Sequence, residues 1–289
     1  MKRASPAVHQ SWRNQDLLNI IVENWTRFTG DPRMLKQLDR TTAQDWLARW
    51  DTQQERYVAD REDRFLVIGD VIEHICAEQI SPEIVDLGCG PGSLTARLAT
   101  RFPAAHITGL DTDPFLLALA EATRPSATAS PRYLDLDLAT PGWAQAVTDG
   151  HLLSAVTTTT ALHWLRPPRL AALYREVADN LRPGGVFVNA DNLYDQQPAL
   201  EELTSVIRRR RAERNRVERN EAWQTWWNSL RQDSRVTSVF SPAQLAGCST
   251  GYANRCSPQW HLEALSAAGF SETGTVWQHG NDYILVGIR

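Results

Sequence analysis

The chain has 289 residues, and its 30 basic and 34 acidic side chains give a net charge of −4 and a sequence pI near 6.0. This slightly acidic balance argues against a generic binder of nucleic acid or of a membrane surface. No apolar run approaches the roughly 20 residues that span a bilayer, and the N-terminal stretch lacks the apolar core of a signal peptide. The four cysteines are widely spread, which favours a reduced, cytoplasmic setting. We expect one large domain with an appendage.

The first part of the chain, residues 1–80, is predicted to be an N-terminal helical cap. Apolar side chains over 17–28 recur at the spacing of one amphipathic helix face. Thr41-Thr42, followed by Asp45, resembles the start of a capped helix. A further helix is expected over 55–77, where apolar residues again recur at helical spacing.

A short apolar run, Ile84 to Leu87, is predicted to be a buried parallel strand. A turn with three glycines at alternate positions and then a helix follow, and the glycines are Gly88, Gly90 and Gly92. Such a turn brings bare backbone N–H groups against a ligand. The spacing differs from the G-x-G-x-x-G of dinucleotide enzymes, and no Walker lysine follows. Asp86 before the turn would repel a pyrophosphate and suits a cationic ligand.

After the glycine turn, strands and helices alternate, which is typical of a parallel, doubly wound sheet. Further strands are expected over 106–110, 132–136, 152–160 and 186–190, with helices over 114–121, after 143 and over 168–181. The alternation then breaks at one long or two shorter helices over 198–230. A helix over 258–268 precedes a hairpin of strands 273–277 and 283–288, whose turn begins at His279-Gly.

The run from Asp86 to Gly92, Asp-Leu-Gly-Cys-Gly-Pro-Gly, resembles motif I of class I S-adenosylmethionine-dependent methyltransferases of the small-molecule type. The resemblance extends over about 55–195 and more loosely over 257–289. It implies a Rossmann-like, doubly wound, mostly parallel seven-stranded sheet with an antiparallel final hairpin, and S-adenosylmethionine as the cofactor. We therefore expect a cofactor-binding core at 81–195, a helical lid insertion at 196–256, and the rest of the core sheet at 257–289.

The same resemblance implies a set of cofactor residues. Asp111, nineteen residues after Gly92, would accept both ribose hydroxyls; the alternative is a helix cap, a role that Asp113 fills better. The remaining motif and strand-end positions expected at the cofactor are Asp86, Gly88, Cys89, Gly90, Gly92, Thr112 and Thr158.

The adenine amino group is expected at the third strand. Asp137 matches the family acid there, with Leu138 supplying a backbone N–H. Asp135, two residues earlier, points the same way along a strand and is a rival.

Upstream, Tyr57, Arg61 and Arg64 lie where related enzymes close over the methionine end of the cofactor. We expect Tyr57 and Arg64 to contact the cofactor, because an arginine could pair with its carboxylate. The alternative is a solvated helix face.

The loop after the fourth strand is expected to flank the transferred methyl group. His163 is the candidate general base, because its unperturbed pKa lies near neutrality, and Trp164 would face the substrate. The alternative is a histidine that only shapes the pocket. The Asn/Asp-Pro-Pro-aromatic tetrad of enzymes that methylate nucleobase amino groups is missing, and no clustered ligand set suggests a metal.

The insertion carries two further features. Seven arginines fall within 208–219, which favours either a solvated helix face or an anion or RNA contact. Three tryptophans then share one helical stripe and would form an aromatic platform for the acceptor, or else a core or dimer contact: Trp223, Trp226 and Trp227.

The resemblance implies methyl transfer to an oxygen, nitrogen or carbon of a small organic acceptor whose identity the sequence does not specify. One alternative is an RNA or protein methyltransferase that uses the arginine-rich segment. Another is a protein that binds S-adenosylmethionine without methylating, or uses it in a different reaction. No nucleic-acid or membrane partner is expected, and a homodimer stays open.

Overall fold

A computed structural model describes residues 37–125, 130–148, 150–247 and 253–289, which lie within one compact unit, Leu35–Arg289. The helix expected over 17–28 lies outside the described residues. Among those that are described, no helix is both long and apolar enough to cross a bilayer.

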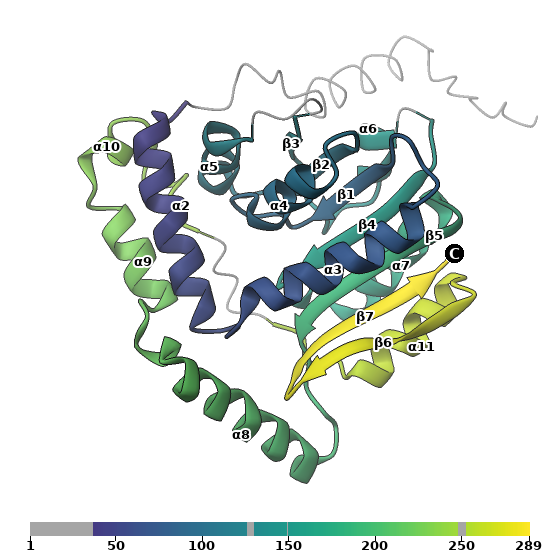
Figure 1. Cartoon of the computed structure of the whole chain (residues 1–289). Coiled ribbons are helices and arrows are strands. Elements are labelled where there is room, and N and C mark those ends of the chain that lie inside the picture. Colours follow the sequence, from purple (N-terminus) through teal and green to yellow (C-terminus); the bar gives the residue numbers. More distant parts are fainter. Residues whose placement is uncertain (1–36, 126–129, 149, 248–252) are drawn as a thin grey trace, which may run out of the picture. The chain divides into compact units, whose positions relative to one another are not determined.

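The centre of the molecule is a seven-stranded sheet in the order β3-β2-β1-β4-β5-β7-β6 (Figure 1). Neighbours from β3 to β5 pair in parallel, whereas β7 pairs antiparallel with both β5 and β6. The strands are β1 (Glu83–Leu87), β2 (His106–Asp111), β3 (Arg132–Asp135), β4 (Leu153–Thr159), β5 (Leu181–Asn192), β6 (Glu272–His279) and β7 (Asp282–Ile288). The predicted fold class is confirmed. The strand order reverses between β1 and β4, the position at which doubly wound sheets bind ligands.

Alternating side chains of the central strands pack on opposite faces of the sheet. Ile84 of β1 packs with the helices α3 (Arg61–Cys76) and α4 (Ser93–Arg101), while its neighbour Val85 packs in a second cluster on the other side. Helices α6 (Trp143–Thr148), α7 (Pro167–Asn180) and α11 (Pro258–Ala268) contribute to that second cluster. Because both faces are covered, β1 and β4 are buried along nearly their whole length, as the apolar sequence of β1 predicted for that strand.

The helical stretch before the sheet differs in detail from its prediction. Helix α2 (Arg40–Glu55) is capped by Asp39, whose carboxylate accepts a hydrogen bond of 2.9 Å from the N–H of Thr42. The Thr41-Thr42 pair therefore lies inside the first turn. The next helix begins at Arg61 rather than at Glu55, because Asp60 adopts a positive φ of 59° that breaks the helical path.

The insertion consists of separate helices rather than one. Helix α8 (Pro198–Asn215) ends at Arg216, whose positive φ of 59° interrupts it, and the short helix η3 (Val217–Arg219) leads to α9 (Trp223–Leu230) and α10 (Ser234–Thr237). Helix α9 packs beside α2 and α5 (Pro114–Thr123) in a separate apolar cluster.

Strand β5 is longer than its prediction of 186–190. Leu181 already pairs with Leu153, and the register shifts before Val186 pairs with Ala155. The Arg-Pro-Gly-Gly run at 182–185 thus forms an irregularity within the strand. The final hairpin is confirmed, with Gly280 at a positive φ of 66° in its turn.

Candidate functional site

The glycine turn after β1 shows why each of its glycines is required. All three have positive φ, between 55° and 77°. A Cβ at Gly88 would lie 2.4 Å from the Cβ of Ala161, and one at Gly92 would lie 2.6 Å from the Tyr133 hydroxyl. At Gly90 the nearest atom would be Cζ2 of Trp50, 3.7 Å away. Gly88 and Gly92 therefore serve packing, whereas at Gly90 a Cβ would make only ordinary contacts with Trp50 and Leu116, so the positive φ is what requires glycine there.

Asp111, at the end of β2, is tied to this turn. Its Oδ2 accepts a hydrogen bond of 2.8 Å from the N–H of Gly90, and its Oδ1 accepts from the N–H groups of Thr112 and Asp113. The helix cap is Asp113 instead, which accepts from Phe115 and Leu116, as predicted. Burial raises the pKa of Asp111. Since Oδ2 accepts a single bond from the protein, it retains a lone pair for a hydroxyl donor.

Asp86 is fully buried beneath the turn. Its Oδ2 accepts a hydrogen bond of 2.6 Å from the Thr95 hydroxyl, while its Oδ1 has no protein partner. Burial raises the pKa of this carboxyl to about 7. A buried carboxylate oxygen without a donor is costly, so it fits a site completed by a cationic or hydrogen-bonding ligand.

The two acids of the third strand lie in different surroundings. Asp137 is exposed and accepts a hydrogen bond of 2.7 Å from the N–H of Ala139, which fixes the turn after β3. Asp135 pairs in register with Asp111, whose charge adds to the effect of burial in raising the pKa of Asp135. Leu138, in the loop between β3 and α6, is buried, and its carbonyl accepts a hydrogen bond from Arg169 of α7. Asp135 therefore lies beside Asp111, whereas Asp137 belongs to the turn beyond β3.

His163 lies in a short helix, η2 (Leu162–Trp164), directly after β4. Its Nδ1 is 2.9 Å from Oδ2 of Asp191, which is buried near the end of β5. Burial alone would lower the pKa of His163, but the charge and hydrogen bond of Asp191 outweigh it, so the net pKa is raised. The ring of Trp164, 38 % exposed, lies 4.9 Å from the imidazole. The Asp191 contact leaves Nε2 for a ligand or proton.

Sequence reasoning missed Asp191. Its only local signal is an acidic residue in the otherwise apolar strand Val-Phe-Val-Asn-Ala-Asp. A buried acid in such a strand has to be paired, and its partner here is 28 residues away.

Two upstream assignments are corrected. Arg64 is fully buried, and its guanidinium pairs with Asp282 and also donates to the Thr159 hydroxyl at 3.2 Å. It is therefore part of the core and not free to pair with a cofactor carboxylate. Arg61 is likewise paired, with Asp51 at 2.6 Å.

The Thr158 side chain also has a structural partner. Its hydroxyl donates to the carbonyl of Leu87 at 2.8 Å and thereby ties β4 to β1. Any contact of Thr158 with a cofactor would have to come from its backbone. Cys89 is similar, since its side chain is buried beside Tyr133 while its backbone lies in the turn.

The tryptophan stripe is corrected as well. Trp226 and Trp227 are 0 % and 2 % exposed, and their rings pack edge-on against the apolar cluster of α2 and α5. They are buried in this cluster and attach α9 to the domain. Trp223 is half-buried, and its backbone N–H donates to the hydroxyl of Tyr57 at 2.9 Å.

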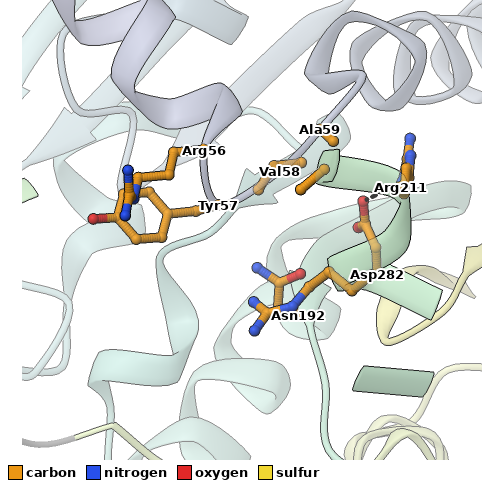
Figure 2. Close-up of a pocket in the computed structure, with 9 residues that line it drawn as sticks. Arg56, Tyr57, Val58, Ala59, Asn192, Arg211 and Asp282 are labelled. Carbon is orange, nitrogen blue, oxygen red and sulfur yellow. Dashed lines mark hydrogen bonds and ion pairs between the residues drawn. The ribbon is translucent and has the colours of Figure 1, made fainter. Parts of the chain in front are cut away.

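A small pocket lies at the other end of the insertion (Figure 2). Its free space is about 10 Å³, enough for roughly one water molecule. Its walls come from the loop after α2, from α8, and from the ends of β5 and β7, and the residues are Arg56, Tyr57, Val58, Ala59, Asn192, Arg208, Arg211, Ala212 and Asp282. Tyr57 was expected at a ligand, whereas Arg56, Asn192 and Asp282 were not. Among the described residues, no group of three or more His, Cys, Asp or Glu side chains could hold a metal ion.

Comparison with known proteins finds one matching family and several curated relatives. Residues 84–185 match the family described as a methyltransferase domain. Trans-aconitate 2-methyltransferase of Azoarcus sp. (strain BH72) is 30% identical over 148 residues, 51% of this chain and 53% of that protein. The Streptomyces coelicolor protein of the same name is 38% identical over 106 residues, 37% of this chain and 33% of its own. The chain thus spans about half or less of the length of these relatives.

The fold also matches a solved structure. An amino pentose methyltransferase from Micromonospora echinaspora, solved with S-adenosylmethionine bound, is 18% identical, with a TM-score of 0.52 over 83% of this chain and 96% of that one. These matches confirm the resemblance inferred from the glycine motif.

Proposed function

We propose that this chain, whose residues 84–185 match a methyltransferase domain on a class I fold, transfers a methyl group from S-adenosylmethionine to a small organic acceptor. The observation that carries the proposal is Gly90. It stands at the switch point of the sheet with positive φ, and its N–H donates to the carboxylate of Asp111. Such a backbone cradle next to a strand-end acid suits a ribose.

Three acids define how the chain would hold the cofactor. Asp111 would accept the ribose hydroxyls through its free lone pairs, and Asp137 or its rival Asp135 would accept from the adenine amino group. Asp86, whose Oδ1 has no protein partner, would favour the positively charged methionine end. When bound, S-adenosylmethionine supplies an electrophilic methyl group on a sulfonium. The protein's part is then to align a nucleophile for in-line displacement.

The acceptor would lie beside the ends of β4 and β5, where His163 and Asp191 meet. Asp191 holds the imidazole by Nδ1 and so presents Nε2, which can take a proton from the attacking atom when the ring is neutral. Trp164, next to the imidazole, would cover the acceptor. Helix α2 before the core and the insertion after β5 would close the site on either side.

The relatives are named for trans-aconitate, but they match over too little of their length to transfer that acceptor to this chain. The test is therefore an assay for S-adenosylhomocysteine released from S-adenosylmethionine over a panel of small acids, alcohols, amines and phenols. We expect turnover with at least one class. Binding of the cofactor with no turnover on any class would instead support the non-methylating alternative.

Two glycine variants test the cofactor site itself by calorimetric titration with S-adenosylhomocysteine. Gly90→Val should abolish binding, because its side chain fills the cradle and disfavours positive φ. Gly184→Val is the matched control: Gly184 has a positive φ of 72° with nothing within 4 Å of a Cβ, and it lies at the opposite end of β5. It should bind normally. Equal affinity in a folded Gly90→Val protein would overturn the assignment.

A further inference from the structure

The turn that carries His163 has little hydrogen bonding of its own. Helix η2 contains three residues, and two backbone hydrogen bonds, of 3.2 and 3.1 Å, close it. Thr160, just before the turn, has a positive φ of 51°, which is unfavourable for a β-branched residue. Such a backbone persists only where the surrounding structure holds it. The position of His163 therefore depends on contacts from outside the turn.

Asn254, near the end of the insertion, supplies three of these contacts. It is buried, with 5 % of its surface exposed. Its backbone N–H donates to the carbonyl of His163 at 2.7 Å. Its Nδ2 donates to the carbonyl of Leu162 at 3.1 Å and to that of Leu165 at 2.9 Å. Because a carboxamide nitrogen has two donor hydrogens, one side chain can serve both carbonyls.

The segment around Asn254 is anchored independently of this turn. Oδ1 of Asn254 accepts a hydrogen bond of 3.2 Å from the N–H of Cys256, which fixes the carboxamide. Arg255 pairs with Glu201 of α8 at 3.0 Å. Ser257 caps helix α11 with its hydroxyl. Since these anchors lie at α8 and α11, Asn254 can hold the turn in place rather than follow it.

The imidazole of His163 is thus fixed at two points. Asp191 holds Nδ1 at 2.9 Å, and Asn254 holds the backbone from which the side chain extends. Together the two contacts determine the direction of Nε2. A general base must lie within about 2.6–3.2 Å of the atom whose proton it takes, and a displacement of about 1 Å can cost roughly 100-fold in rate. Small shifts of the turn are therefore expected to matter.

We propose that Asn254 is a positioning residue for His163: its three hydrogen bonds to the turn keep the imidazole against Asp191 and Nε2 directed at the acceptor. This inference rests on the proposed function. Asn254 acts through the turn and not on the acceptor itself. It also gives the end of the insertion a defined role, because this segment connects α8 and α11 with the proposed proton acceptor.

The first test is an NMR titration of the His163 imidazole, whose signal is identified by its absence in His163→Gln. The charged groups that act on this ring are Asp191, which raises its pKa, and Arg64, which lowers it. Asn254→Ala removes the two side-chain hydrogen bonds to the turn. The contact with Asp191 should loosen, so the pKa of His163 should fall toward its ordinary value. This measurement requires no acceptor.

The second test is the turnover of Asn254→Ala with an acceptor that the panel identifies. The turnover number kcat should fall by about 10- to 100-fold, because the base is displaced. The affinity for S-adenosylhomocysteine should stay unchanged, since the turn after β1 and Asp111 are not altered. A general loss of folding would lower both quantities.

The matched control is Ser257→Ala, three residues further along the same segment. Ser257 is buried, and its hydroxyl caps α11 instead of bonding the turn of His163. Loss of the cap should lower thermal stability, while the pKa of His163 and kcat stay unchanged. Asn254→Ser can still accept from Cys256 and donate one hydrogen bond, so it should give an intermediate result. It carries the test if Asn254→Ala does not fold.

An unchanged pKa of His163 or an unchanged kcat in the folded Asn254→Ala or Asn254→Ser protein overturns the inference. Equal changes in Ser257→Ala overturn it too, because they would show a loss of stability and not of positioning. Failure of the unaltered protein to bind S-adenosylhomocysteine is a different result. It contradicts the proposed function, while the NMR titration still decides whether Asn254 positions His163.

Discussion

The two sides of the proposed site are built in different ways. On the β1–β2 side, backbone N–H groups hold the acidic side chain in place. The N–H of Gly90 donates to Asp111, and the N–H groups of the two residues that follow Asp111 donate to the same carboxylate. On the β5–β7 side, the structure is held by ion pairs between charged side chains from distant parts of the chain. Arg64 and Asp282 are 218 residues apart, and Arg211 and Asp60 are 151 apart.

This difference suggests a division of labour. A site made of backbone N–H groups and glycines is set by one strand–turn–helix unit and suits a ligand common to many enzymes. A site made of side chains on an inserted helix can change without disturbing the sheet. We therefore assign cofactor binding to the first side and acceptor choice to the second, and the following variants test that assignment.

The largest loss of stability is expected for Trp226→Ala, because the Trp226 ring is fully buried between α9, α2 and α5. Truncating a buried tryptophan costs about 3–5 kcal/mol, so urea unfolding should show a loss of that order. Trp223→Ala, at a half-buried position on the same helix, should cost clearly less. If the Trp226→Ala protein is stable but its use of the acceptor is impaired, the result would instead support the interpretation of these tryptophans as a platform for the acceptor.

A comparable loss is expected for Arg64→Met, which leaves Asp282 buried with only the longer contact to Arg211. Removing one partner of a buried ion pair costs about 3–5 kcal/mol. Arg97→Met is the control, because its pair with Glu62 is exposed and should contribute little. The double variant Arg64→Met/Asp282→Leu should recover part of the stability. If Arg64→Met and Arg97→Met unfold at the same urea concentration, the buried network is not stabilising.

Asp111→Ala should weaken S-adenosylhomocysteine binding by about 1.5–3 kcal/mol, the range for charged hydrogen bonds. Acceptor binding should change little if the two sides are separate. Calorimetry measures both. Normal cofactor affinity together with a loss of thermal stability would mean that Asp111 only secures the Gly90 turn.

Cofactor affinity should also depend on pH through Asp86, whose pKa is raised to about 7. A cationic ligand favours the ionised carboxyl, so affinity should fall by up to about tenfold per pH unit below 7. The ligand-free protein should show the opposite trend: because the folded state holds this proton more tightly than the unfolded state, stability declines as pH rises from about 4 to 7. Asp86→Asn should flatten both profiles, and profiles that stay unchanged contradict the role.

The smallest effect is expected for Asp191→Asn. This variant should change the pH dependence of the turnover rate. Asp191 raises the pKa of His163, and the neutral ring is the base. Loss of the charge should therefore move the acid limb of the rate profile to lower pH. His163→Gln should remove that limb. If the acid limb of the profile stays in place in both variants, the proton acceptor is a residue other than His163.

The same contrast explains how far the sequence could predict the structure. The glycine turn, the Asp113 cap and the final hairpin could be predicted, because each depends on residues close in sequence. Asp39 was missed as the cap of α2 because Thr41-Thr42, just after it, offered the same kind of signal. Periodicity showed that Trp226 lies on a stripe but not which helices cover it.

The ion pairs of the β5–β7 side could not be predicted at all. Arginine is abundant in this chain, and its local sequence does not reveal whether a guanidinium faces solvent, an internal acid or a ligand. Three arginines illustrate the three cases. Arg64 is buried in the core and paired with Asp282, and Arg211 joins α8 to β7 through the same acid. Arg208 lines the pocket and forms no ion pair with the described residues.

The most direct test of cofactor binding on the β1–β2 side is a crystal structure with S-adenosylhomocysteine bound. The account predicts the ribose hydroxyls within hydrogen-bond distance of the Asp111 carboxylate, the adenosine against Gly90, and the homocysteine sulfur toward His163. An adenosine bound elsewhere, or an Asp111 carboxylate that makes no contact with the ligand, would contradict it.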